Sequence, residues 1–193
     1  LIGQRGRRGA LMISMDINHP DIEDFIDIKT DLNKVTKANI SVRINDKFME
    51  SVENKEKYVC RFIVEETNDA YKLFMKIITN NWDFAEPGIL FWDNIEKYHL
   101  LSEDKEFKYA GVNPCAEEPL PSGGSCLLGS INLAEFVVEP FTNNAIFDIQ
   151  KFKNTVADCI IGLNEVLDEG LELHPLKEQK ESVRQYRQIG LGV

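Results

Sequence analysis

Three side chains that could share one reaction stand at alternate positions of a short run: Asn113, Cys115 and Glu117. In an extended segment alternate residues point to the same side, so a carboxamide, a thiol and a carboxylate would face one small pocket. A carboxylate beside a thiol opposes thiolate formation. The set therefore suits hydrogen-atom chemistry at Cys115, with Glu117 handling a separate proton. Taken alone, the pattern is weak evidence, because a loop cysteine near a glutamate usually has no catalytic role.

The chain has four cysteines: Cys60, Cys115, Cys126 and Cys159. They form no CxxC pair and have no nearby histidine at zinc-ligand spacing, so no metal site is expected. Cys159 lies on the apolar face of a predicted helix and Cys60 in a strand-like run, and both are interpreted as packed thiols. Without a secretory pattern, the cysteines indicate a cytoplasmic protein whose resting thiols are reduced.

Composition narrows the class of protein. The net charge of −10 disfavours broad binding to nucleic acid, and the 43% of apolar residues are enough for a core. No apolar run approaches the ~20 residues of a membrane helix, so no membrane association is expected. The chain opens with Leu1-Ile2-Gly3 and stops at Val193 after a Gly-Leu-Gly run that resembles a turn. Both ends are interpreted as cuts in a longer chain, with residues 1–193 forming one partial domain.

The elements that must position these groups alternate between strands and helices, which predicts an α/β fold. Periodicity predicts strands at 9–17, 40–44, 58–64 and 89–92, and helices at 21–29, from 45 or 46 to 52, at 67–82 and at 149–173. Asp21 is the predicted N-cap of the first helix. The segment 98–124 has little periodicity, and a long segment of this kind is often functional. It contains the Asn-Pro-Cys run.

Two helices carry clear apolar stripes. The stripe of the helix at 67–82 consists of Ala70, Leu73, Phe74, Ile77 and Ile78. The stripe of the helix at 149–173 consists of Phe152, Val156, Cys159, Ile160, Leu163, Val166 and Leu167. Both stripes are expected to pack against a core.

Several separated motifs resemble, in order, the catalytic subunit of ribonucleotide reductases. The finger-loop pattern of that family is similar to Asn-Pro-Cys-Ala-Glu at 113–117 and Gly-Gly-Ser-Cys-Leu-Leu-Gly-Ser-Ile-Asn-Leu at 123–133. Further matches are Arg-Arg-Gly-Ala at 7–10, His-Pro-Asp-Ile-Glu at 19–23, Ala-Asn-Ile-Ser-Val at 38–42 and Ile-Gly-Leu-Gly-Val at 189–193. The resemblance spans nearly the whole chain, which makes it more specific than any single motif.

The resemblance implies part of a ten-stranded α/β barrel with the finger loop at its centre. It implies reduction of ribonucleotides to deoxyribonucleotides, the precursors of DNA. Cys115 would carry a thiyl radical that removes the 3′ hydrogen atom of the ribose. Glu117 would act as base toward the 3′ hydroxyl, and Asn113 would bind the ribose hydroxyls. Such positioning around one carbon is a large part of catalysis.

Other residues take roles from the resemblance alone. Cys126 matches one of two cysteines that reduce the substrate and end as a disulfide, which a thioredoxin-type reductant would reopen. The family partner of Cys126 lies upstream of Leu1. Gly9 matches a glycine at the substrate pocket. The basic segment 3–9 around it could cradle a phosphate, or be a solvated loop.

Residues 30–39 would correspond to the loop that passes information from a bound effector (dNTP or ATP) to the substrate base. Lys34 and Lys37 are candidate contacts there, although two exposed lysines on a loop would look the same. Such coupling needs two nucleotide sites. A homodimer is one possible state of the full-length protein.

The compact spacing of Cys115 and Cys126 looks most like the adenosylcobalamin-dependent class, in which the cofactor would generate the radical. Members with a separate radical-generating subunit usually have a longer insertion between these cysteines, and the glycyl-radical class lacks this pattern. Two alternatives stay open. One is a catalytically inactive nucleotide-binding regulatory module. The other is a different radical enzyme on the same barrel, which would not need Cys126.

Overall fold

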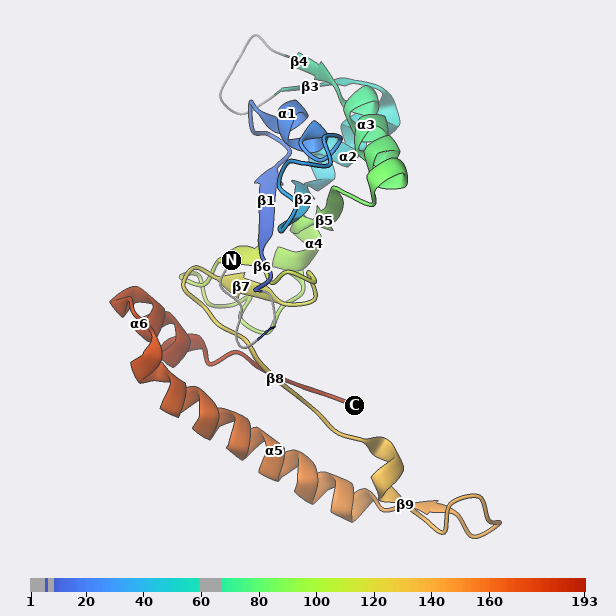
Figure 1. The fold of residues 1–193 in the computed structure, drawn as a ribbon, viewed down its shortest axis with the longest axis vertical. Helices are drawn as coiled ribbons and strands as arrows, with labels where there is room; N and C mark the ends of the chain where they lie inside the picture. The colour runs from blue at the N-terminus through green and yellow to red at the C-terminus, as the bar shows by residue number, and fades with distance from the viewer. Residues whose placement is uncertain (1–5, 7–8, 60–66) are drawn as a thin grey trace. The chain divides into compact units, whose positions relative to one another are not determined.

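The computed structural model describes residues 6, 9–59 and 67–193, drawn as a ribbon in Figure 1. The chain divides into two compact units, Leu1–Pro119 and Leu120–Val193. Strands and helices alternate in both units, so the predicted α/β class is confirmed.

The first unit is built on a parallel three-stranded sheet with the order β1-β2-β5. Its strands are β1 (Met12–Asp16), β2 (Asn39–Ile44) and β5 (Gly88–Phe91). Four helices follow strands or connect them: α1 (Ile22–Asp27), α2 (Asp46–Asn54), α3 (Ala70–Phe84) and α4 (Trp92–Lys97). A short antiparallel pair, β3 (Lys57–Val59) and β4 (Thr67–Asp69), lies between α2 and α3 in the sequence.

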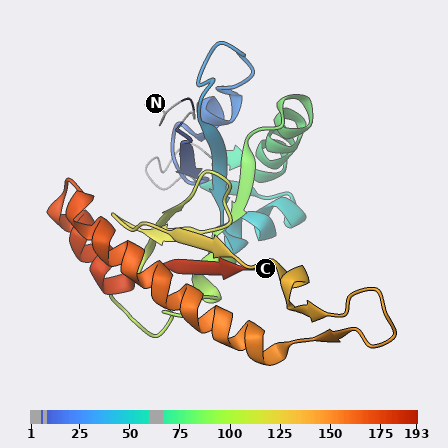
Figure 2. The same cartoon turned by 60° about the horizontal axis from the view of Figure 1, so that its bottom comes forward.

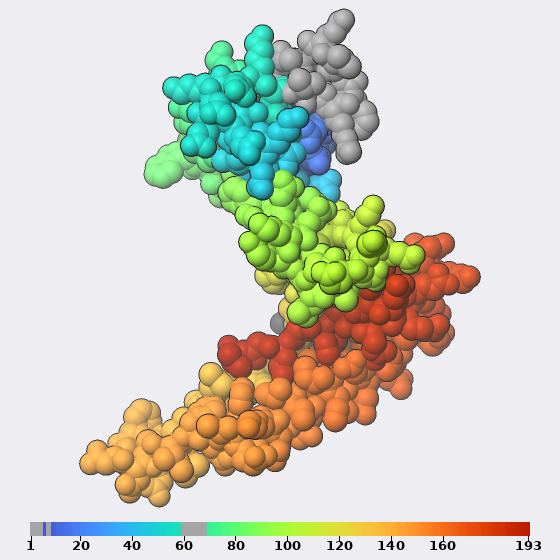
Figure 3. Space-filling model, turned by 180° about the vertical axis from the view of Figure 1, so that it is seen from behind, coloured from blue at the N-terminus to red at the C-terminus, as the bar shows by residue number. Residues whose placement is uncertain are grey.

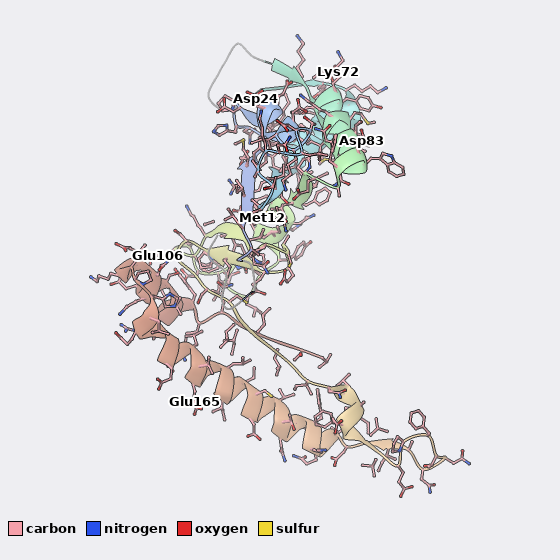
Figure 4. All side chains as sticks on the ribbon, in the orientation of Figure 1. Met12, Asp24, Lys72, Asp83, Glu106 and Glu165 are labelled. Carbon is pink, nitrogen blue, oxygen red and sulfur yellow. The ribbon has the colours of Figure 1, made fainter. Side chains whose placement is uncertain are left out.

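The central strand β2 has two chemically different faces, because successive side chains of a strand point to opposite sides. Ile40, Val42 and Ile44 are buried in the core beside Phe48 of α2 and Ile77 of α3. The alternate residues of β2 are polar, and they occupy the opposite face: Asn39, Ser41 and Arg43. The polar sides of the surrounding helices point outward, as the labelled Asp24, Lys72 and Asp83 do in Figure 4.

Local capping explains where two of these helices begin. The Asn45 side chain accepts a hydrogen bond from the backbone N–H of Phe48 at 2.8 Å, and α2 starts at the next residue, as predicted. Asp69 accepts in the same way from Lys72 at 3.1 Å and caps α3. Asp21 occupies the predicted N-cap position of α1, but its side chain makes no capping hydrogen bond.

Several predicted elements in this unit need correction. The helix predicted from residue 67 begins at Ala70, because Thr67–Asp69 pairs with β3 as β4. Its residue Ile78 is 39% exposed and leaves the buried stripe. The predicted buried strand at 9–17 shrinks to β1, an edge strand on which Ile13 is 39% exposed. Helix α4 was not predicted, and the strand predicted beyond Val59 lies outside the described residues.

The second unit is a parallel strand pair joined by a helical connection (Figure 2). Strand β8 (Leu127–Ser130) pairs with β11 (Ile189–Gly192), so the turn expected at the end of the chain is a strand. Between them lie η1 (Leu133–Phe136), β9 (Val137–Val138), β10 (Ile146–Phe147), α5 (Ile149–Gly170), η2 (Leu171–Leu173) and α6 (Lys177–Tyr186). Helix α6 was not predicted.

The predicted helix at 149–173 is confirmed as α5 followed by η2. Most of its predicted apolar face is half-buried rather than buried. Leu167 is its only fully buried member, and it packs with Leu171 and Val183 into a small core, whereas Val166 is 58% exposed. Figure 3 shows the α5 segment, in orange, open to solvent along one side.

Candidate active site

Cys115 lies in a six-residue loop, 113–118, called here the Cys115 loop. It follows β6 (Tyr109–Val112) and precedes β7 (Pro119–Pro121), which pairs with β6. Asn113 closes the loop at its base. Its N–H donates to the Glu118 carbonyl at 3.1 Å, and its side-chain Oδ1 accepts from the Glu118 N–H at 3.0 Å.

The tip of the Cys115 loop is a β-turn. The N–H of Ala116 donates to the Asn113 carbonyl at 2.9 Å, with Pro114 and Cys115 at the two central positions. Proline favours this geometry, because its ring fixes φ near the value that the first central position needs. Ala116 then adopts a φ of 66°, which is left-handed and unusual for a residue with a Cβ.

This geometry corrects the prediction that Asn113, Cys115 and Glu117 follow one another in an extended run. The chain turns at Cys115, so the alternation argument for one shared pocket fails. Cys115 and Glu117 are exposed and Asn113 is half-buried, and no hydrogen bond joins these three side chains within the described part of the chain. The loop therefore offers a thiol and a carboxylate to an incoming group rather than enclosing them.

The polar face of β2 contacts the Cys115 loop and the strand before it. The Asn39 side chain donates through Nδ2 to the Pro114 carbonyl at 2.7 Å. Arg43 donates through Nη1 to the Ala110 carbonyl of β6 at 3.3 Å, and its guanidinium lies 4.9 Å from the centre of the Trp92 ring. No sequence pattern pointed to Arg43, and Asn39 stood out only as part of a motif.

A second carboxylate, Glu118, was also missed. Burial raises the pKa of Glu118 above its ordinary 4.5, and the charge of neighbouring Glu117 raises it further. Burial likewise raises the pKa of Tyr109, with a further contribution from Glu118. The consecutive acids at 117 and 118 were the available signal, because two adjacent carboxylates resist ionising together.

The remaining cysteines differ in their setting. Cys126 is half-buried, immediately before β8, and belongs to the second unit, whereas Cys115 belongs to the first. Cys159 is a half-buried thiol on α5 rather than a fully buried core residue. Cys60 lies outside the described residues.

A polar cavity of about 470 Å³ lies at the amino ends of β1 and β2, and Gly9, Lys37 and Asn39 line it. Its wall also holds an ion pair of Lys29 with Glu86, whose Oε1 accepts a hydrogen bond from the Ile40 N–H at 3.0 Å. The structure thus brings together two of the predicted site residues, Gly9 and Lys37.

Lys34 does not line this cavity. It is exposed and lies 4.0 Å from Asp31 within the same loop, residues 30–38. The predicted loop conformation of this segment is confirmed up to the start of β2 at Asn39. The arginines of the basic segment 3–9 lie outside the described residues.

The described residues contain neither a metal-ligand cluster nor a membrane-spanning helix. They contain no group of three or more histidine, cysteine, aspartate or glutamate side chains that could hold a metal ion. Within the same residues, no helix is both long and apolar enough to cross a membrane.

A protein-family model matches almost the whole chain. Residues 2–193 match the model of the ribonucleotide reductase barrel domain. The chain belongs to the ribonucleotide reductase barrel-domain family. The predicted resemblance, and the prediction that the chain is part of this barrel, are therefore confirmed.

Two relatives within the family are named vitamin B12-dependent reductases. The chain is 32% identical to a vitamin B12-dependent ribonucleotide reductase of Streptomyces clavuligerus, over 98% of this chain and 22% of that protein. It is 34% identical to a vitamin B12-dependent ribonucleoside-diphosphate reductase of Thermoplasma acidophilum, over 97% of this chain and 24% of that protein. The chain thus spans about a quarter of the length of these relatives.

A solved structure shares the fold. The class Id ribonucleotide reductase alpha subunit of Actinobacillus ureae superposes with a TM-score of 0.67, at 20% identity, over 97% of this chain and 34% of that chain. At this level of identity the likeness concerns the fold alone.

Proposed function

We propose that these residues supply the catalytic loop of a ribonucleotide reductase, which converts ribonucleoside di- or triphosphates to deoxyribonucleotides. The observation that carries the proposal is the Cys115 loop. It presents an exposed thiol at the tip of a turn whose base is closed by Asn113, within a chain of the reductase barrel family. The thiol is therefore accessible to substrate, while the loop that carries it is held by hydrogen bonds. Catalysis by positioning requires both properties.

In the proposed reaction Cys115 works as a thiyl radical and takes the 3′ hydrogen atom of the ribose. Glu117 is exposed beside it and accepts the proton of the 3′ hydroxyl. Asn113 contributes its Nδ2 group to a ribose hydroxyl, since its Oδ1 is already used by the Glu118 N–H. The division of the Asn113 carboxamide between loop and substrate refines the role expected from the family.

The reducing electrons in this proposal come from Cys126 and a second cysteine outside this chain, which end as a disulfide that a thioredoxin-type protein reopens. Gly9 lines the cavity at the amino end of β1, where the close backbone approach of a glycine would leave room for substrate. Lys37 lines the same cavity and Lys34 lies exposed on the same loop, and both are proposed contacts in communication with an effector nucleotide.

The radical source in the proposal is adenosylcobalamin, in keeping with the vitamin B12-dependent relatives. When bound, this cofactor supplies a radical by homolysis of its carbon–cobalt bond. The exposure of Cys115 fits this assignment, because a thiol oxidised by a group held outside the described residues must be accessible from outside. No residue of this chain is assigned as a corrin contact.

The test replaces Cys115 by serine in the full-length polypeptide that carries these residues. The Cys115→Ser variant is expected to lose deoxyribonucleotide formation while retaining nucleotide binding, measured by product analysis and equilibrium binding. Cys159→Ser is the matched control and should keep turnover, because Cys159 is a half-buried thiol of α5 with no part in the proposed reaction. Turnover by Cys115→Ser would refute the radical role. A wild-type protein that binds nucleotides without turnover would favour the regulatory-module alternative.

A further inference from the structure

We propose that Asn39 and Arg43, on the polar face of β2, are positioning residues. They hold the Cys115 loop in place through hydrogen bonds to the carbonyls of Pro114 and Ala110. For its effect on turnover, the proposal rests on the reductase function proposed above. Its structural part stands on the contacts alone. Asn39 also lines the cavity that includes Gly9, and the proposal concerns its contact with the loop.

Strand β2 has one apolar face and one polar face. Its apolar residues Ile40, Val42 and Ile44 are 0–1% exposed and anchor the strand in the helical core. A strand held so firmly on one side is a rigid support for whatever lies on the other. On that other side Ser41 is 4% exposed, and it is flanked by the two residues that reach the loop.

The two hydrogen bonds from β2 to the segment 110–114 have matched spacing. Asn39 and Arg43 are four residues apart on β2, and their acceptors Pro114 and Ala110 are also four residues apart. Four residues of strand span about 13 Å. The pairs run in opposite directions, 39 with 114 and 43 with 110, so the segment 110–114 lies antiparallel across this face. Two contacts at matched spacing fix both the position and the direction of the segment.

Asn39 holds the peptide group that joins Pro114 to Cys115. The Pro114 carbonyl belongs to the same planar unit as the Cys115 nitrogen, because the peptide bond is rigid. The turn itself uses the carbonyl of Asn113 and leaves that of Pro114 outside its hydrogen bonding. The contact from Asn39 therefore fixes the plane from which the Cys115 side chain departs.

The backbone of Asn39 is itself held in the β1–β2 ladder. Its backbone N–H donates to the Leu11 carbonyl at 2.8 Å, and it pairs with Met12 at the start of the β1–β2 ladder. The next residue, Ile40, donates to Glu86, which is in turn paired with Lys29. The Asn39 side chain thus extends from backbone held on both neighbouring sides.

The test uses Asn39→Asp in the full-length polypeptide, a change that keeps the size of the side chain but replaces the Nδ2 donor by an oxygen facing the Pro114 carbonyl. Asn54→Asp is the matched control. It adds the same charge to the same unit at an exposed position, the last residue of α2. Two measurements are made: the rate of hydrogen exchange of the Ala116 amide, whose N–H closes the turn at Cys115, and the kcat and KM of the reductase reaction.

With the loop released, hydrogen exchange of the Ala116 amide should accelerate about threefold, since local opening governs the exchange of a hydrogen-bonded amide. The kcat should fall about tenfold or more with KM nearly unchanged, because misplacement of the reacting group affects the chemical step. Asn54→Asp should match the wild type in both. A wild-type exchange rate of the Ala116 amide in Asn39→Asp would overturn the proposal.

A second variant covers the case in which Asn39→Asp does not fold. Arg43→Lys keeps the positive charge but shortens the reach and removes the planar fork, so the bond to the Ala110 carbonyl is lost. It should raise the exchange rate of the Ala116 amide in the same direction, and an unchanged rate in this variant would refute the proposal. If the wild-type protein shows no turnover, the proposed function fails, while the exchange measurements still decide whether β2 holds the loop.

Discussion

The side-chain Oδ1 of Asn113 accepts a hydrogen bond from the backbone N–H of Glu118 at 3.0 Å, at the point where a hairpin would ordinarily use a backbone carbonyl. The Asn113 carbonyl is instead occupied by the N–H of Ala116. One residue therefore closes both the base and the tip of the Cys115 loop. Its Nδ2 group has no such task in the loop.

This division of the Asn113 carboxamide predicts different outcomes for two variants. Asn113→Ala leaves the Glu118 N–H without its acceptor, and a lost hydrogen bond of about 1 kcal/mol should lower the hydrogen-exchange protection of that amide several-fold. Asn113→Asp keeps an acceptor, so its protection should stay near that of the wild type. Both variants should lose turnover, because neither can donate to a ribose hydroxyl. Full turnover in Asn113→Asp would contradict the role proposed for Nδ2.

The carboxyl of Glu118 should titrate above its ordinary pKa of 4.5, chiefly because it is partly buried and also because Glu117 is charged. A carboxylic acid with a raised folded pKa favours the folded state below its unfolded pKa, and this contribution is lost as the pH rises through the folded value. The titration can be followed by carbon NMR of labelled glutamate. In Glu117→Gln the Glu118 midpoint should move down toward 4.5, and an unmoved midpoint would show that Glu117 does not act on it.

The sequence predicted features that depend on neighbouring residues better than features that depend on residues far apart in the chain. Asn45 as a helix start and β2 as a strand were correct, since capping and alternation act between near neighbours. The extended run through Cys115 was wrong, because Pro114 favours a turn that the alternation argument ignored. The contacts of Asn39 and Arg43 could not be predicted, because each joins residues more than sixty positions apart.

Two adjacent isoleucines of α3 show the same limit and allow a matched test. Ile77 is 0% exposed and Ile78 is 39% exposed, although both fit the predicted apolar stripe. Ile77→Ala should lower the free energy of unfolding by about 2–5 kcal/mol, the range for a large-to-small change in a packed core. Ile78→Ala should cost less than about 1 kcal/mol. Urea-induced unfolding followed by circular dichroism measures both, and equal losses would show that the two side chains are equally packed.

In the second unit, Arg187 joins the end of α6 to α5. Its guanidinium donates to both carboxylate oxygens of Asp168, at 2.6 and 2.9 Å, and its Nε donates to the Asn164 side chain at 3.0 Å. Arg187 adopts a left-handed φ of 42°, two residues before β11 begins at Ile189. The planar fork of arginine matches a carboxylate at two points, which lysine cannot do. This contact should therefore depend on the shape of the side chain as well as on its charge.

The hydrogen bond from Arg187 holds the pKa of Asp168 below its ordinary 3.8. An acid with a lowered folded pKa stabilises the folded state above its unfolded pKa, and this contribution is lost as the pH falls through the folded value. Asp168→Asn should therefore be less stable than the wild type at neutral pH, and the difference should shrink below about pH 3.8. Arg187→Lys should show a smaller loss in the same direction, because one hydrogen bond replaces two. Thermal unfolding at a series of pH values measures both, and a difference that persists unchanged into the acid range would mean that ionisation of Asp168 is not what stabilises this junction.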